Sequence, residues 1–95
     1  MHEVLLNYEG TKMTLNALDL SPQGVGVWGP ASCPAGPFKL SLPLDDSLGP
    51  LVVDAKVARQ FQSDGGAVWG IHFIDLDDEA KRRLADYIAR QHAAA

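Results

Sequence analysis

The chain has 95 residues, of which 46% are hydrophobic and 21% are charged, a balance typical of a globular protein rather than of a disordered chain. Its formal net charge of −4 argues against a binder of nucleic-acid polymers, which need a clustered basic face. No apolar run approaches the roughly 18 residues of a membrane-spanning helix, and no secretory signal is recognisable, so we expect one cytoplasmic domain over residues 1–95 without membrane insertion.

Alternation of apolar and polar residues predicts about six strands before residue 75. The segments with this pattern are 4–8, 13–20, 24–28, 38–44, 51–62 and 67–74. Gly, Asp and Pro separate most of them, so consecutive strands should form antiparallel hairpins. Residues 29–37 are rich in Gly and Pro and should form a surface loop instead. Pro43 has no N–H to donate, which places it on an edge strand or at a strand end.

The spacing of apolar residues changes to that of an α-helix after residue 75, and we expect this helix to cover about residues 77–92. Asp77 is a suitable N-cap. Two ion pairs are expected on the exposed face, Asp78 with Arg82 and Glu79 with Arg83. The expected inner stripe consists of Ala80, Leu84, Tyr87, Ile88 and Gln91. These elements predict an antiparallel barrel or curled sheet with the helix on its outside or across one end.

The turn at residues 19–24 carries the strongest candidate for a binding site. Ser21, Pro22 and Gly24 suit the first, second and fourth positions of a type I turn. Gly24 has no Cβ, so a ligand or another backbone can approach it closely. Asp19 and Ser21 lie two residues apart and share a face if the strand runs that far, which combines a carboxylate and a hydroxyl. The alternative is an ordinary turn in which both side chains only satisfy nearby backbone N–H groups.

The position of Arg59 conflicts with its strand pattern. Val53, Ala55 and Val57 share one face of the predicted strand 51–62, and Arg59 falls on the same parity. An inward arginine is costly unless a bulge turns it outward or an acid pairs with it. We therefore expect Arg59 at a strand end or in a site.

Nothing in the sequence indicates an enzyme or a metal centre. The candidate residues show neither a catalytic pairing nor ligand spacing; they are His2, His72, His92 and the single cysteine, Cys33. We expect no catalytic residue, no metal site and no cofactor. Trp28 and Trp69 either fill the core or mark a surface for a partner.

Several short motifs occur in order along nearly the whole chain. A D/N-x-S-x-x-G pattern is formed by Asp19, Ser21 and Gly24, and the small and hydrophobic residues Val25–Val27 follow it; a later G-hydrophobic-x-F pattern is formed by Gly70–Phe73, and an acidic entry into a basic last helix by Asp77–Leu84. In this order the motifs resemble the PilZ domain family, bacterial receptors for the second messenger cyclic di-GMP. The resemblance implies a mainly β fold, a six-stranded antiparallel barrel over about residues 3–74 with a C-terminal α-helix.

The resemblance also implies a ligand and its contacts. Asp19 and Ser21 would hydrogen-bond a guanine edge of cyclic di-GMP, and Gly24 would make room for it. Family members that bind the messenger carry an R-x-x-x-R motif ahead of the first strand, and this sequence has almost no room for it and no Arg or Lys pair at that spacing. Direct binding would then need Arg59, the C-terminal arginines Arg82, Arg83 and Arg90, or a partner chain to supply the missing cations.

The function that follows is a non-catalytic PilZ-like module of bacterial cyclic di-GMP signalling, a receptor or an adaptor acting through protein contacts. The processes that the family serves are motility, pili, exopolysaccharide and virulence. The alternative is a ligand-free interaction barrel in which Trp28, Trp69 and the loop at 29–37 form a partner surface. A protein partner is expected in both cases, and a homodimer is left open.

Overall fold

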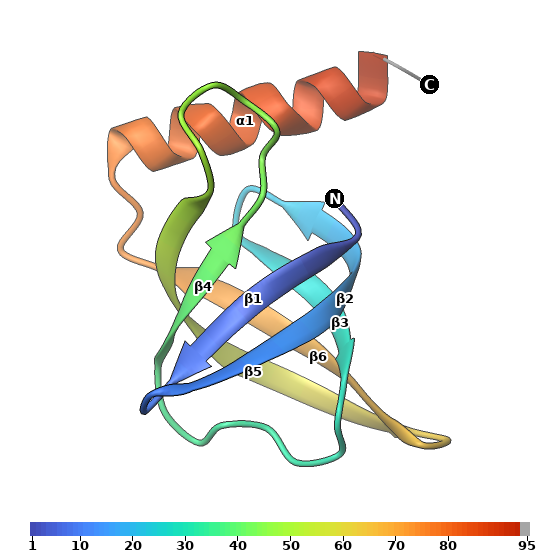
Figure 1. Ribbon diagram of the computed structural model, residues 1–95. Coiled ribbons are helices and arrows are strands. Elements are labelled where there is room, and N and C mark those ends of the chain that lie inside the picture. The colour runs from blue at the N-terminus through green and yellow to red at the C-terminus, as the bar shows by residue number, and fades with distance from the viewer. Residues whose placement is uncertain (94–95) are drawn as a thin grey trace.

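The structure is a computed structural model that describes residues 1–93, with side chains described through Gln91 (Figure 1). It contains six strands and one helix: β1 Glu3–Tyr8, β2 Thr11–Ser21, β3 Gly24–Gly29, β4 Phe38–Leu42, β5 Leu51–Ser63, β6 Gly66–Ile74 and α1 Asp78–Ala93. The strands form a closed barrel in the order β1-β2-β3-β6-β5-β4, and every neighbouring pair is antiparallel. The six-stranded antiparallel barrel with a C-terminal helix is therefore confirmed.

The barrel closes because β1 pairs with β4 as well as with β2. Leu6 lies opposite Met13 of β2 on one side and opposite Leu40 of β4 on the other. Inward side chains from all six strands fill the interior, as alternation along a strand requires. The most deeply buried of them include Leu6, Leu15, Val27, Leu40, Ala55 and Trp69. Pro43 directly follows the last residue of β4, so the prediction of a strand end is correct.

Two β-bulges interrupt this alternation. One lies in β2 between Ala17 and Asp19, and the other lies in β5 between Val57 and Arg59. Each bulge inserts one unpaired residue, which reverses the face on which the following residues lie. Leu15 is buried, yet Asp19, four residues later, is exposed, and Arg59 is exposed although Val53 and Ala55 on the same parity are buried.

Helix α1 covers the upper end of the barrel (Figure 1). Asp77 is its N-cap as predicted, because Asp77 Oδ1 accepts a hydrogen bond of 2.7 Å from the backbone N–H of Ala80. Ala80, Leu84 and Tyr87 are buried against the core, which confirms most of the predicted inner stripe, whereas Gln91 is exposed. No helix among residues 1–93 has the length and apolar character needed to cross a bilayer.

The loop between β4 and β5 is tied to α1 by Arg83. The Arg83 guanidinium donates to both carboxylate oxygens of Asp46, at 3.0 and 2.8 Å, and to the carbonyl oxygen of Gly49. The predicted pair between Glu79 and Arg83 is therefore wrong. The Asp46 carboxylate accepts two hydrogen bonds from the guanidinium, whereas a pair with the exposed Glu79 carboxylate would be weakened by solvent. The predicted pair of Asp78 with Arg82 is likewise not among the ion pairs of the described residues.

The tie between Asp46 and Arg83 should make stability depend on pH. Hydrogen bonds from Arg83 lower the pKa of Asp46 below its ordinary value. The ionised Asp46 carboxylate therefore stabilises the folded state. This contribution is complete above the pKa of the unfolded chain, about 3.9, and is lost as pH falls through the lower pKa of the folded protein. We expect Asp46→Asn to lower the melting temperature at neutral pH, and the difference from wild type to shrink below about pH 4.

Asp45→Asn is the matched control for this experiment, because Asp45 is exposed and its φ of 57° suits asparagine equally well. Thermal unfolding followed by circular dichroism at a series of pH values measures both variants. An Asp46→Asn penalty that stays constant down to about pH 2 would contradict the assignment.

Candidate functional site

An open groove of about 360 Å³ lies on the outer face of the barrel, over β2, β3, β5 and β6. Its lining includes all four residues that the sequence analysis singled out, Asp19, Ser21, Gly24 and Arg59. The first three come from one hairpin, and Arg59 comes from a strand 35 or more residues further along the chain. The fold therefore brings an acid, a hydroxyl and a guanidinium to one groove.

Asp19 faces the groove because it follows the bulge in β2. Its side chain folds over β3, where Oδ1 accepts a hydrogen bond of 3.0 Å from the backbone N–H of Gly26. A Cβ on Gly26 would overlap the carboxylate, so glycine leaves room for the side chain in this position. Asp19 is exposed, and its Oδ2 accepts no hydrogen bond from any described residue. One carboxylate oxygen thus positions the side chain, and the other is open to a ligand.

Ser21 and Gly24 close the hairpin that joins β2 to β3. The Ser21 hydroxyl donates to the carbonyl oxygen of Gly24 and accepts from the backbone N–H of Gln23, both at 3.3 Å. A Cβ on Gly24 would overlap the carbonyl oxygen of Ile71 in β6. Of the two alternatives left open for Gly24, the structure shows close approach of another backbone. Both residues also line the groove, so their contact with a ligand stays a prediction.

Arg59 reaches the groove because of the second bulge. It pairs with Gly70 of β6, and a Cβ on Gly70 would lie 3.0 Å from Arg59 Cγ, so the arginine stem lies across the glycine. Its guanidinium forms no ion pair or hydrogen bond with the described residues. Arg59 does not lie at a strand end, since β5 continues to Ser63, and the bulge turns it outward. Its place in a binding site stays a prediction.

The three C-terminal arginines lie elsewhere. Arg83 is bound to Asp46, and Arg90 donates to the carbonyl oxygens of Asp86 and Leu44, each at 3.4 Å. Arg82 borders a separate cavity with Asp46, Asp86 and Arg90. None of the three lines the groove, so Arg59 is the arginine that the fold places beside Asp19.

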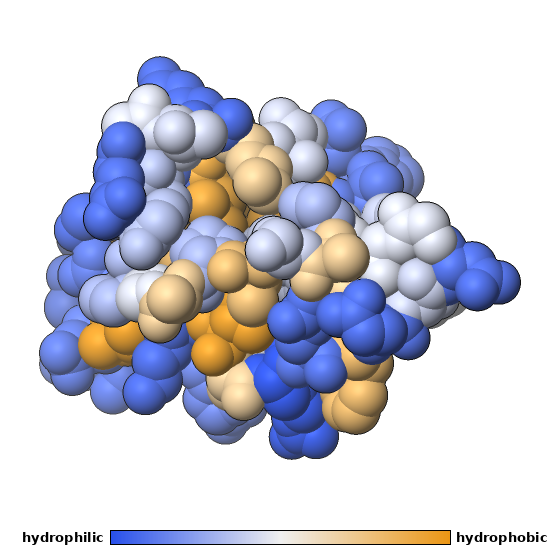
Figure 2. Space-filling view, turned by 90° about the horizontal axis from the view of Figure 1, so that it is seen from below, coloured by the Kyte–Doolittle hydropathy of each residue, from blue (hydrophilic) through white to orange (hydrophobic). Residues whose placement is uncertain are grey.

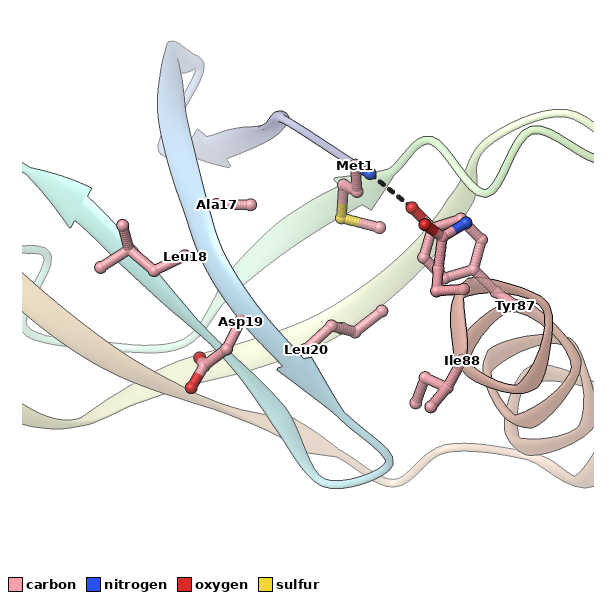
Figure 3. Close-up of a pocket in the computed structure, with 8 residues that line it drawn as sticks. Met1, Ala17, Leu18, Asp19, Leu20, Tyr87 and Ile88 are labelled. Carbon is pink, nitrogen blue, oxygen red and sulfur yellow. Dashed lines mark hydrogen bonds between the residues drawn. The ribbon is translucent and has the colours of Figure 1, made fainter. Parts of the chain in front are cut away.

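A second cavity, of about 320 Å³, lies between β2 and α1 (Figure 3). Met1, Leu20, Tyr87 and Ile88 converge on it, whereas Asp19 points to the other side of β2. The Met1 amino group donates to the Tyr87 hydroxyl at 2.5 Å. Burial raises the pKa of Tyr87 above its ordinary value, with a further contribution from the charge of Asp45. This cavity adjoins the groove, because Leu18, Asp19 and Leu20 of β2 line both.

The structure decides between the two alternatives for Trp69 and leaves the role of Trp28 a prediction. Trp69 is fully buried, and its Nε1 donates to the carbonyl oxygen of Pro30 at 3.0 Å, so it belongs to the core and holds the loop at 30–37. Trp28 is half-buried. Apolar residues gather in the middle of the lower end of the barrel, with hydrophilic residues around them (Figure 2). The side-chain amide of Gln60 also donates to the carbonyl oxygen of Ala31, in the loop at 30–37.

Comparison with known proteins identifies the family. The family model of the PilZ domain matches residues 1–90, and the chain belongs to this family. A solved structure described as the PilZ domain with c-di-GMP of YcgR from Escherichia coli superposes with a TM-score of 0.65, at 15% sequence identity, over 97% of this chain and 87% of that one. At this identity the superposition supports the fold alone. A search of curated proteins finds no significant match.

The close approach at Gly24 gives a test of its structural role. We expect Gly24→Ala to destabilise the ligand-free protein by about 1–3 kcal/mol, because the new methyl group meets a backbone oxygen that cannot move without shifting β6. Gly36→Ala is the control, since the nearest atom to a Cβ there is Tyr8 Oη at 3.9 Å. Urea denaturation measures both. A Gly24→Ala variant as stable as wild type would contradict this packing role.

Proposed function

We propose that this PilZ domain is a non-catalytic module of cyclic di-GMP signalling in the bacterial cytoplasm, acting as a receptor or adaptor through protein contacts. The observation that carries this proposal is the groove in which Asp19, Ser21, Gly24 and Arg59 lie together. The proposal also draws on membership of the family and on the messenger named for the E. coli PilZ domain.

The groove suits a guanine base better than it suits phosphates. An ionised carboxylate only accepts hydrogen bonds, so the open oxygen of Asp19 favours a ligand edge that presents N–H groups. Cyclic di-GMP also carries two phosphate charges, and Arg59 is the single arginine or lysine on the groove. A site with few cations loses charge-assisted hydrogen bonds, each worth about 1.5–3 kcal/mol. The isolated chain should therefore bind the messenger weakly.

Exposed apolar side chains beside the groove favour protein contacts. Leu18, the inserted residue of the β2 bulge, is 58% exposed, and Phe61 of β5 is also 58% exposed. Both line the groove, next to its polar residues. Large apolar side chains left in water next to a polar site are typical of surfaces that a partner covers. A partner docked there would bury them and supply further cations to the ligand.

Isothermal titration calorimetry with cyclic di-GMP tests the proposal. We expect a dissociation constant weaker than about 10 µM for the wild-type chain, because each missing charge-assisted bond costs roughly tenfold or more in affinity. Asp19→Ala should weaken binding further, since it removes the acceptor for the base, and Ser21→Ala should do so to a smaller extent. Glu9→Ala is the control, because Glu9 is exposed in the turn between β1 and β2 and does not line the groove.

Two outcomes would change the proposal. A dissociation constant tighter than about 10 µM that is lost in Asp19→Ala would make the chain a direct receptor rather than an adaptor. Absence of any binding at millimolar ligand, in a protein that still captures a partner, would favour the ligand-free interaction barrel.

A further inference from the structure

The exposed side of α1 carries a charge strip made of Asp78, Arg82, Asp86 and Arg90. Residues four apart are neighbours on a helix, so these side chains follow one another along it and their signs alternate. All four residues are exposed. The helix lies across the upper end of the barrel, and in Figure 1 no other part of the chain lies above it. The strip is therefore accessible to another molecule.

The charge strip is not neutralised within the chain. No ion pair of the described residues joins two members of the strip or joins a member to another residue. Arg90 donates only to the carbonyl oxygens of Asp86 and Leu44, each at 3.4 Å. Arg82 precedes Asp86, and a base that precedes an acid is the less favourable order for a pair within one helix. The four charges are thus available to charges on a second molecule.

The order of the signs is self-complementary. Read from the N-terminal end, the strip gives acid, base, acid, base, and read from the other end it gives the opposite sign at every position. Two copies of α1 packed antiparallel about a two-fold axis therefore place Arg82 opposite Asp86 of the other copy, and Asp78 opposite Arg90, each contact occurring twice. In a parallel pair each residue would face its own copy, and all four contacts would be repulsive. The pattern selects a second copy of this chain in one orientation.

The surroundings of the charge strip leave room for a second helix. Ala85 and Ala89 lie beside it and are exposed, and small side chains at a helix contact allow a short distance between the axes. A hollow of about 440 Å³ lies between α1 and the loop that joins β4 to β5, with Arg82, Asp86 and Ala89 in its lining. Leu48 of this loop also lines the hollow and is 65% exposed. A helix placed on the strip would cover this apolar side chain.

We propose that α1 docks on α1 of a second copy of this chain, antiparallel, with reciprocal pairs of Arg82 and Asp86 at the centre and of Asp78 and Arg90 outside them. One helix and one loop per copy form a small interface, and contacts that bury less than about 1,200 Å² are typically weak and transient. The strip does not line the groove of Asp19 and Arg59, so both copies keep that groove open.

Sedimentation velocity of the full chain tests the association. We expect the wild-type chain to dimerise over a concentration range from about 10 µM to 1 mM at about 50 mM salt. Association should weaken at about 500 mM salt, because salt screens exposed charges.

Reversal of single charges tests the interface. Arg82→Glu and Asp86→Arg each replace two attractive contacts by two repulsive ones, so each should weaken self-association roughly tenfold or more. The double variant Arg82→Glu/Asp86→Arg should dimerise again, because both central contacts regain opposite charges. An equimolar mixture of the two single variants should also dimerise, although neither does so alone, since every central contact between the two different chains is then attractive.

Lys12→Glu is the matched control. Lys12 is exposed at the start of β2, and its reversal changes the net charge by the same amount as Arg82→Glu without touching α1. This variant should dimerise like wild type apart from a small effect of net charge. Circular dichroism of each variant checks that it folds.

Several outcomes would overturn the proposal. A wild-type chain that stays monomeric at about 1 mM and low salt would exclude the dimer. Association that survives either single reversal, or a mixture that associates no more than its components, would exclude the antiparallel contact of the charge strips. An equal loss of association in Lys12→Glu would assign the effect to net charge instead. None of these outcomes affects the proposed function, because the cyclic di-GMP titration concerns residues outside the strip.

Discussion

Two inserted residues decide what this barrel presents to solvent. In a closed barrel every side chain points either into the core or out of it, and the side changes with each residue. Asp19 falls on the parity of the buried Leu15, and Arg59 falls on the parity of the buried Ala55, so regular strands would direct both charges into the core. The bulges at Leu18 and Ala58 reverse the parity just before each charged residue. The cost of a local disruption in two ladders is small compared with the cost of burying two unpaired charges.

The same bulges also shape the groove, because they lie in the two strands that border it. β2 and β5 are the longest strands, and they flank the pair formed by β3 and β6. Glycine occupies the outward positions of that pair at Gly26 and Gly70, and the Asp19 carboxylate lies over the first while the Arg59 stem lies over the second. Gly24 has a different role, because its missing Cβ accommodates the backbone of β6. The three glycines thus have two roles: Gly24 allows close packing against β6, and Gly26 and Gly70 leave room for the two charged side chains.

The helix and its loop have a separate function from the groove. Arg83 is engaged with Asp46, and Arg90 lies over the ring of Tyr87, 5.9 Å from its centre. These cations stabilise the cover of the upper barrel end and are not free to move to a ligand on the side of the barrel. The charge of the groove therefore depends on one acid, Asp19, and one arginine, Arg59.

The local features of this protein follow from its sequence alone. Alternation placed the six strands, Asp77 marked the start of the helix, and the Asp19, Ser21 and Gly24 pattern marked the turn, because each of these depends on residues close together in the chain. The partner of Arg83 was predicted wrongly, since the competing acceptor, Asp46, lies 37 residues away. The outward direction of Asp19 and its place in one groove with Arg59 were likewise decided only by tertiary structure. Register between distant strands sets both, and a one-residue bulge, which leaves little trace in the sequence, is enough to reverse a face.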